Sequence, residues 1–313
     1  MAKILITHGV PAEGFSLLAG HELLIPAPLE AYTMEELSAL IPGVEAVVAG
    51  GRLPGEVIRL GGKLRNLANS GAGYDGVDVR AAAACGIPVT NIPDTVTADT
   101  AELAMTLMLA VSRRAGEMNL RLRSEPSDTL FGMGRHMGAS LRGRTLGIIG
   151  CGRIGRRTAE LARVFGMRVL GCSRSGADAS VCEPVDFDTI LREADVISLH
   201  CPLTEETRGL IGRVALAAMK PGVLIINTAR GAVIDHDALM EALESGHVGG
   251  AGLDVFPEEP QIPQRLLELP HVVCTPHIGT NTRQTRFEMA QACSRQILDA
   301  LTGRRPENIV NGL

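Results

Sequence analysis

Three segments in the last third of the chain each place a reactive side chain just beyond a predicted strand. These side chains are Arg230, Glu259 and His277. An arginine can bind a carboxylate through two parallel hydrogen bonds, and a histidine can gain or lose a proton near neutral pH. A neighbouring carboxylate orients an imidazole and favours its protonated form. Because ligands bind at the carboxyl ends of strands in open α/β sheets, we expect the three side chains to share one site.

The three residue types match the needs of one reaction, the interconversion of a 2-oxo acid and a 2-hydroxy acid. A cation must hold the substrate carboxylate and polarise the carbonyl, an acid must protonate the nascent alkoxide, and a carboxylate should orient that acid. We therefore predict Arg230 as the cation, His277 as the acid and Glu259 as its orienting group. Glu258 is the obvious rival to Glu259.

A glycine-rich turn lies upstream of this set. Residues Gly150–Gly155 match G-x-G-x-x-G, follow the predicted strand Thr145–Ile149 and open a predicted helix that runs to Val164. The first glycine permits a tight turn, the second lets the backbone approach a pyrophosphate, and the third allows close helix–strand packing. The context predicts a dinucleotide-binding domain with a nicotinamide cofactor.

The end of the next predicted strand bears on which cofactor is used. NAD sites usually carry Asp or Glu here, to bind the ribose hydroxyls. This chain has Ser173 in that place, with Arg174 beside it. Loss of the acid removes repulsion against a 2′-phosphate, and a guanidinium can pair with that phosphate. We predict that NADPH is preferred and that NADH is a lesser alternative.

Apolar runs alternate with helix-like segments throughout the 313 residues, which predicts an α/β protein with parallel sheets. The length suits two domains. The last helix, about residues 285–301, needs a surface for Met289, Ala292 and Ile297, and the first α/β layer is its natural host. We therefore expect a discontinuous substrate domain (1–98 plus 286–313) around an inserted nucleotide-binding domain (99–285). The predicted strands are Ile4–Thr7, Val47–Ala49, Leu67–Asn69, Ile87–Thr90, Thr145–Ile149, Arg168–Gly171, Asp195–Leu199, Val223–Asn227, Gly252–Val255 and Val272–Thr275, and a helix buried on all sides is expected over about 100–114.

Composition excludes several other classes of protein. With 45% hydrophobic residues and a formal net charge of −5, the chain gives no reason to expect a nucleic-acid or membrane partner. Its seven cysteines are scattered without metal-ligand spacing, which predicts no metal site and reduced thiols in the cytoplasm. The arginine-rich stretch 113–144 is either a basic binding patch or a solvated linker with a surface helix. We favour the linker, because the arginines of the stretch are not interleaved with stacking aromatics, Phe131 being the one aromatic among residues 113–144.

The chain resembles the D-isomer-specific 2-hydroxyacid dehydrogenase family nearly end to end. Asn227–Gly231 followed by Val233–Asp235 resembles its arginine segment, and Asp254–Pro260 its glutamate segment. Pro276-His277 with Gly279 resembles its histidine segment, and the 18-residue interval from Glu259 to His277 also agrees. The family pattern selects Glu259 over Glu258, because Glu259 directly precedes proline.

The resemblance implies two Rossmann-like doubly wound domains, the substrate domain being flavodoxin-like, and the usual homodimer of the family. It implies that Ala72 and Gly73, in the loop Ser70–Gly73, bind the substrate carboxylate through backbone N–H groups, together with Arg230 and His277. The implied cofactor contacts are Thr100, Gly150, Gly152, Arg153, Ile154, Gly155, Ser173, Arg174, Cys201, Pro202, Thr228, Ala229, Arg230, Asp254, His277 and Gly279.

Within the family, the segment 91–102 resembles the glyoxylate and hydroxypyruvate reductase branch. Val96 stands where phosphoglycerate and formate dehydrogenases carry Asn, and Ala72 stands where phosphite dehydrogenases carry Lys. Two departures concern the pocket: the linker has Phe131–Gly134 and no Trp, and Pro257 replaces a commonly polar residue. The alternatives are a phosphoglycerate-type or other D-2-hydroxyacid dehydrogenase, or a non-catalytic dinucleotide-sensing corepressor of the same fold.

Overall fold

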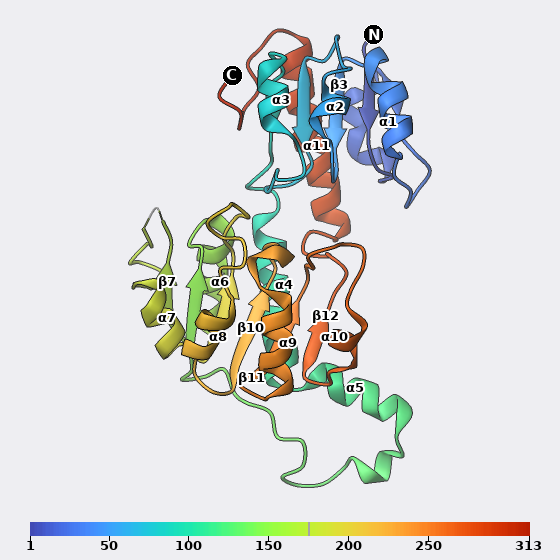
Figure 1. Cartoon of the computed structure of the whole chain (residues 1–313). Helices are drawn as coiled ribbons and strands as arrows, with labels where there is room; N and C mark the ends of the chain where they lie inside the picture. Colours follow the sequence, from blue (N-terminus) through green and yellow to red (C-terminus); the bar gives the residue numbers. More distant parts are fainter. Residues whose placement is uncertain (175) are drawn as a thin grey trace. The chain divides into compact units, whose positions relative to one another are not determined.

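The computed structural model describes residues 1–174 and 176–313, which form two compact units (Figure 1). Unit 1 contains Met1–Val96 and Thr280–Leu313, and unit 2 contains Thr97–Gly279. Unit 1 is therefore discontinuous in sequence, and both chain ends lie in it. Among the described residues, none of the helices combines the length and apolar character that a membrane crossing requires.

Unit 1 is a five-stranded parallel sheet with strand order β2-β1-β3-β4-β5, which is the flavodoxin-like order. Its central strands are buried on both faces, which is why they read as continuous apolar runs. As predicted, the last helix covers this sheet, with Met289 and Ile297 buried and Ala292 partly buried in the core. The elements are β1 (Lys3–Ile6), η1 (Ala12–Leu18), β2 (Glu22–Leu24), α1 (Met34–Leu40), η2 (Ile41–Gly43), β3 (Ala46–Ala49), α2 (Gly55–Ile58), β4 (Asn66–Asn69), α3 (Val79–Ala84), β5 (Val89–Thr90) and α11 (Arg283–Leu301).

Unit 2 is a parallel sheet of order β12-β11-β10-β9-β6-β7-β8. The strand order reverses beside β6, which precedes the glycine-rich turn, as in a Rossmann domain. Helices α4 and α6 pack on one face, and α7, α8 and α9 on the other. The elements are α4 (Thr97–Ser112), α5 (Ala115–Ser124), η3 (Ser127–Thr129), β6 (Thr145–Ile149), α6 (Arg153–Val164), β7 (Arg168–Cys172), β8 (Glu183–Pro184), α7 (Phe187–Glu193), β9 (Val196–Leu199), α8 (Arg213–Ala218), β10 (Val223–Asn227), η4 (Gly231–Val233), α9 (His236–Glu244), β11 (Val248–Leu253), α10 (Gln264–Glu268) and β12 (Val272–Cys274).

Two sequence expectations for unit 2 were wrong. Strand β11 begins at Val248, four residues before its predicted start, because a run with three glycines reads poorly as a strand. The glycines are required by packing: a Cβ atom on Gly250 or Gly252 would lie 2.7 or 2.8 Å from side chains of α4. Helix α4 is not buried on all sides, since Ala98, Glu102 and Thr106 form an exposed stripe. The edge strand β8, only two residues long, was also missed.

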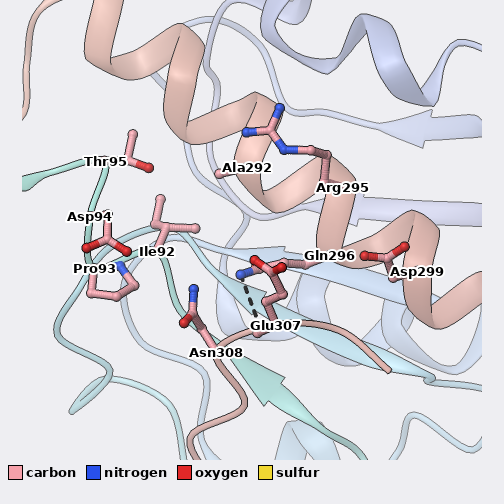
Figure 2. A pocket seen from close by; sticks show the side chains of 10 residues that line it. All are labelled: Ile92, Pro93, Asp94, Thr95, Ala292, Arg295, Gln296, Asp299, Glu307 and Asn308. Carbon is pink, nitrogen blue, oxygen red and sulfur yellow. Dashed lines mark hydrogen bonds between the residues drawn. The ribbon is translucent and has the colours of Figure 1, made fainter. Parts of the chain in front are cut away.

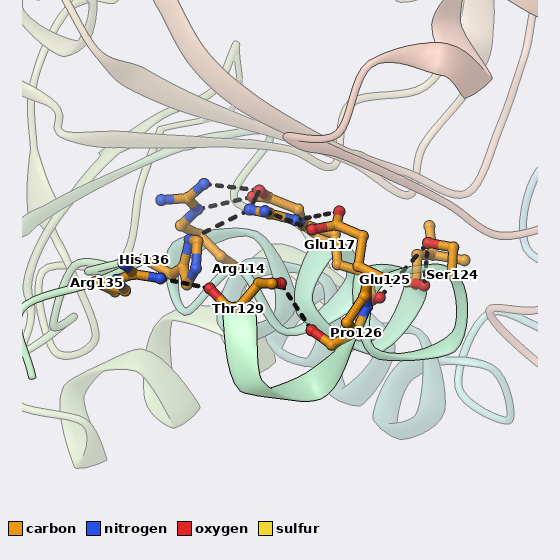
Figure 3. A network of polar contacts seen from close by, with 10 residues as sticks. Arg114, Glu117, Ser124, Glu125, Pro126, Thr129, Arg135 and His136 are labelled. Carbon is orange, nitrogen blue, oxygen red and sulfur yellow. Dashed lines mark hydrogen bonds and ion pairs between the residues drawn. The ribbon is translucent and has the colours of Figure 1, made fainter. Parts of the chain in front are cut away.

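The arginine-rich stretch is a surface helix and loop, as favoured from the sequence (Figure 1). Two of its arginines, Arg114 and Arg121, pair with glutamates of the stretch itself (Figure 3). Arg114 makes two 2.7 Å hydrogen bonds to Glu117, and Arg121 pairs with Glu125 at 2.7 Å and contacts His136 at 3.3 Å. These arginines order the segment and do not form a basic binding patch.

Candidate active site

The three predicted reactive side chains lie on one edge of the unit 2 sheet. Arg230 follows β10, Glu259 follows β11 and His277 follows β12, and these strands are neighbours in the sheet. Since all three strands are parallel, their carboxyl ends meet at the same edge. Sheet order thus brings together residues that are up to 47 positions apart in the chain.

His277 and Glu259 are in direct contact. The imidazole Nδ1 lies 2.7 Å from Glu259 Oε2, and Glu259 Oε1 accepts a 2.9 Å hydrogen bond from the Phe256 N–H. Burial acts to raise the pKa of Glu259, but the bonds from His277 and Phe256 and the charge of Arg230 outweigh it and lower that pKa. Glu259 is therefore an ionised acceptor that fixes the orientation of the ring.

Arg230 is held by its own strand end. The Asn227 side chain donates to the Arg230 carbonyl at 2.9 Å and accepts from the Ala229 N–H at 2.9 Å. The next residue, Gly231, must lack a side chain, because a Cβ atom there would lie 2.0 Å from the Phe256 carbonyl carbon. This close passage brings the glutamate segment against the arginine segment.

His277 has a left-handed backbone, with φ of 52°, which is uncommon for histidine. The buried Asp254 stabilises this turn. Its carboxylate accepts hydrogen bonds from Thr275 Oγ1 at 2.6 Å, the Ile278 N–H at 2.8 Å and the Gly279 N–H at 2.9 Å. Asp254, predicted only as a cofactor contact, thus also positions the histidine loop. The sequence signal that could have revealed this role is an aspartate directly after a predicted strand.

Glu258, the rival carboxylate, is exposed and makes no side-chain hydrogen bond or ion pair with a described residue. Only Glu259 reaches the imidazole. The geometry therefore favours the same glutamate as the family pattern.

The glycine-rich turn has the shape that a dinucleotide needs. A Cβ atom on Gly150 would lie 2.5 Å from the Cys201 nitrogen, and one on Gly155 would lie 2.1 Å from the Gly150 oxygen. Gly152, by contrast, has open space where its side chain would be, and no side chain caps helix α6 there. A diphosphate can therefore approach the helix N-terminus, where its charge is favoured.

Other predicted cofactor contacts surround this turn in unit 2. Cys201 and Pro202 follow β9, and Thr228 and Ala229 follow β10, the adjacent strand. Thr228 Oγ1 and His200 Nδ1 are buried without a hydrogen-bond partner among the described residues. Such orphaned polar atoms fit a site that is completed by a bound cofactor. Gly279 sits beside Thr100, whose Oγ1 would lie 3.6 Å from a Cβ atom added to that glycine.

Ser173 and Arg174 follow β7, beside the turn. The Ser173 hydroxyl donates to the Gly176 carbonyl at 2.8 Å. Arg174 lies 3.7 Å from Glu206, and their side chains are 87% and 76% exposed. A pair so exposed contributes little energy, so the guanidinium can turn toward a ligand at small cost.

The unit 1 loop after β4 presents backbone donors. Asn69 Nδ2 binds the carbonyls of Gly71 and Gly73 at 3.0 Å, and Asn91 Nδ2 binds that of Ala72 at 2.8 Å. The N–H groups of Ala72 and Gly73 donate to no described residue. They are thus available to donate to an anion. The two asparagines were not predicted, although amides beside buried strands are a recognisable signal.

Unit 1 also contains a cavity of about 290 Å³ between the segment after β5 and α11 (Figure 2). Arg295 shares its lining with Asp94, Asp299 and Glu307. Because three carboxylates outnumber one guanidinium, the lining does not favour an anion. In the described part of the chain, no cluster of His, Cys, Asp and Glu could hold a metal ion.

Comparisons with known proteins agree with this geometry. The family model of the D-isomer specific 2-hydroxyacid dehydrogenase NAD binding domain matches residues 105–279. A glyoxylate reductase of Thermococcus litoralis is 39% identical over 99% of this chain and 96% of its own length. A D-3-phosphoglycerate dehydrogenase of Methanocaldococcus jannaschii is 37% identical over 99% of this chain but only 60% of its own.

A solved structure extends the agreement to three dimensions. The NADPH-dependent glyoxylate/hydroxypyruvate reductase of Sinorhizobium meliloti, in complex with NADP and malonate, is 29% identical with a TM-score of 0.87. The match covers 99% of this chain and 96% of that one. With this fold, this NAD binding domain and these relatives, the chain belongs to the D-isomer-specific 2-hydroxyacid dehydrogenase family.

Proposed function

We propose that the protein reduces a small 2-oxo acid such as glyoxylate or hydroxypyruvate to the D-2-hydroxy acid with NAD(P)H, and catalyses the reverse reaction. The observation that carries this proposal is the 2.7 Å contact between His277 and Glu259, beside Arg230, at the carboxyl edge of the unit 2 sheet. The glyoxylate reductases among the relatives support the choice of substrate.

Each side chain has a definite task in this proposal. Arg230 binds the substrate carboxylate and polarises the carbonyl, and the N–H groups of Ala72 and Gly73 bind the carboxylate. His277 gives its proton to the carbonyl oxygen as that oxygen gains charge, while Glu259 stabilises the imidazolium. The bound nicotinamide supplies the hydride. In the reverse direction, His277 removes the hydroxyl proton.

The direct test is oxidation of NADPH, followed at 340 nm, with glyoxylate, hydroxypyruvate and 3-phosphohydroxypyruvate as separate substrates. We expect turnover with the first two. Preference for the phosphorylated substrate would favour a phosphoglycerate-type dehydrogenase, the alternative supported by the relative from Methanocaldococcus jannaschii. Tight cofactor binding without turnover of any 2-oxo acid would instead favour the dinucleotide-sensing corepressor.

We propose NADPH as the preferred cofactor, through Arg174 and Ser173. Support comes from the serine in place of the usual acid and from the weak, exposed contact between Arg174 and Glu206. We expect Arg174→Ala to lower kcat/KM for NADPH about 10-fold or more, since a charge-assisted hydrogen bond contributes about 1.5–3 kcal/mol. The value for NADH should change less than about 2-fold, because NADH lacks the 2′-phosphate.

Arg157→Ala is the matched control for this experiment, because Arg157 is a half-exposed arginine of the same unit that pairs with Glu160. Its kcat/KM values should stay near those of the unchanged protein. Equal use of NADH and NADPH by the unchanged protein, with a ratio insensitive to Arg174→Ala, would contradict the preference.

We propose a homodimer that forms through unit 2, with α5 and the loop after it in the interface. The arginine–glutamate pairs satisfy the polar side of this segment (Figure 3). Its large apolar side chains face solvent instead, with Phe131 75% and Met137 76% exposed. Such an exposed apolar group is typical of a surface that a partner covers. The other exposed large apolar side chains of this segment are Leu120, Leu122 and Met133.

We expect the double variant Leu120→Gln/Phe131→Ser to be a monomer in analytical ultracentrifugation at micromolar concentration, where the unchanged protein is a dimer. Removal of two large apolar contacts raises the Kd of an interface, by an amount between several-fold and orders of magnitude. Val164→Ser and Val214→Ser, at exposed positions elsewhere in unit 2, should remain dimeric. A monomeric unchanged protein would contradict the proposal.

We propose the cytoplasm as the location. All seven cysteines are free thiols, and Cys85 is exposed among them. Free thiols persist in a reducing compartment, which supports this assignment.

A further inference from the structure

One arginine of unit 1 has an unexplained environment. Arg286, in the first turns of α11, is half-buried. Its guanidinium makes no hydrogen bond or ion pair with any residue that the structure describes. Burial lowers the pKa of Arg286, and no acidic side chain counteracts this effect. A desolvated cation without a partner is costly, so its retention at this place calls for a ligand.

A histidine lies near enough to Arg286 for the positive charge of the guanidinium to act on its ring. His8 follows β1, and its ring lies against the backbone of Gly50, where a Cβ atom would come within 2.2 Å of the ring. Burial, followed by the charge of Arg286, lowers the pKa of His8 to about 4. The side-chain contact of the ring is a long one, 3.4 Å from Nδ1 to Thr7 Oγ1. The neutral imidazole therefore retains an N–H that can donate to an anion held by Arg286.

Both residues belong to the ligand-binding edge of unit 1. His8 follows β1, Gly50 follows β3, and the loop with Ala72 and Gly73 follows β4, and these strands are consecutive in the sheet. Two strand spacings place the end of β1 about 10 Å from the end of β4. Helix α11 packs against both β4 and η1, and its residues Phe287 and Ala290 lie against Gly14 of η1, which places the neighbouring Arg286 near the end of β1.

We infer that Arg286 and His8 form an anion subsite that takes the second carboxylate of a 2-oxo dicarboxylic acid, while the loop at Ala72 and Gly73 holds the first. The carboxyl carbons of a five-carbon diacid lie about 5 Å apart. A hydrogen-bonded contact of about 3 Å at each end extends the reach to about 11 Å. This matches the separation along the sheet edge. Shorter acids such as glyoxylate leave the subsite unused.

The inference rests on the proposed function and extends its substrate class to 2-oxo acids of four or five carbons with a terminal carboxylate. The other arginine near this end of α11, Arg283, is exposed, and Arg295 shares its cavity with three acidic groups. Of these three arginines, Arg286 is the one that is partly buried and has no acidic side chain acting on its pKa.

The kinetic test compares 2-oxoglutarate with 2-oxopentanoate, which has the same chain length but no second carboxylate. We expect Arg286→Gln to lower kcat/KM for 2-oxoglutarate at least about 10-fold and to change that for 2-oxopentanoate less than about 2-fold. His8→Gln should cause a smaller loss with the same selectivity. Arg283→Gln, the matched control on the same helix, should affect neither substrate. Equal losses with both substrates, or no loss with 2-oxoglutarate, would overturn the inference.

A binding experiment separates this inference from the proposed reaction. Glutarate has two carboxylates and no oxo group, so it binds without turnover, and butyrate serves as the monoacid control. We expect glutarate, but not butyrate, to shift the imidazole NMR signals of His8, which His8→Gln assigns, and Arg286→Gln to abolish that shift. If glutarate leaves the His8 signals unchanged, the subsite does not exist. If glutarate binds but no 2-oxo acid is reduced, the subsite stands and the proposed function fails.

Discussion

His277→Ala is expected to lower kcat for glyoxylate reduction by about 10³-fold, because a positioned general acid contributes about 10²–10⁴-fold to such a step. The imidazole is half-exposed, and among the described residues its one hydrogen-bond partner is Glu259, so its loss should leave the fold intact. Steady-state NADPH oxidation, with NADPH binding and thermal unfolding measured on the same sample, checks both statements.

The neighbouring glutamates provide the control for this result. Glu259→Gln should lower kcat by a smaller factor than His277→Ala, because the amide still holds the ring but no longer stabilises its charge. Glu258→Gln removes the same charge from an exposed position next to it and should leave kcat unchanged. If Glu258→Gln were the damaging change, or if His277→Ala retained near-normal turnover, the acid–base assignment would be wrong.

Arg230→Ala is expected to lower kcat/KM for the 2-oxo acid by about 10³-fold or more, since one group both binds the carboxylate and polarises the carbonyl. Arg230→Lys should recover only a minor part of this loss, because an ammonium keeps the charge but cannot form two parallel hydrogen bonds. Rates over a range of substrate concentrations separate the effects: the lysine variant should raise KM and lower kcat together.

Arg208→Ala is the matched control for the arginine, because Arg208 is an exposed arginine of the same unit outside the site. Its kinetics should equal those of the unchanged protein. The Arg230 variants should also retain the melting temperature, since Asn227 binds the Arg230 backbone and not its guanidinium. A lysine variant with full activity would show that a positive charge alone is enough for catalysis. It would exclude the proposed pair of parallel hydrogen bonds from the guanidinium to the carboxylate.

Local sequence patterns were sufficient to predict the reactive side chains and the glycine-rich turn of this protein. Short apolar runs such as Val223–Asn227 are typical of buried strands, and glycines spaced as in Gly150–Gly155 after such a strand are typical of a tight turn before a helix. Reactive side chains placed just beyond such strands are brought to one edge by any parallel sheet. Arg230, Glu259 and His277 were therefore identifiable without coordinates, and the choice between Glu258 and Glu259 needed only the family pattern.

Other features depended on residues that are distant in sequence, and only the tertiary structure decided them. Gly250 and Gly252 look like breaks in a strand until helix α4 is seen to occupy the space of their side chains. The role of Asp254 in shaping the His277 turn, and the effect of the Arg286 charge on His8, arise from groups more than 20 residues apart. The sequence of a segment shows which of its side chains can be buried. How closely other segments pack against it, and how far its polar groups are desolvated, depend on the neighbours that the folded chain brings to it.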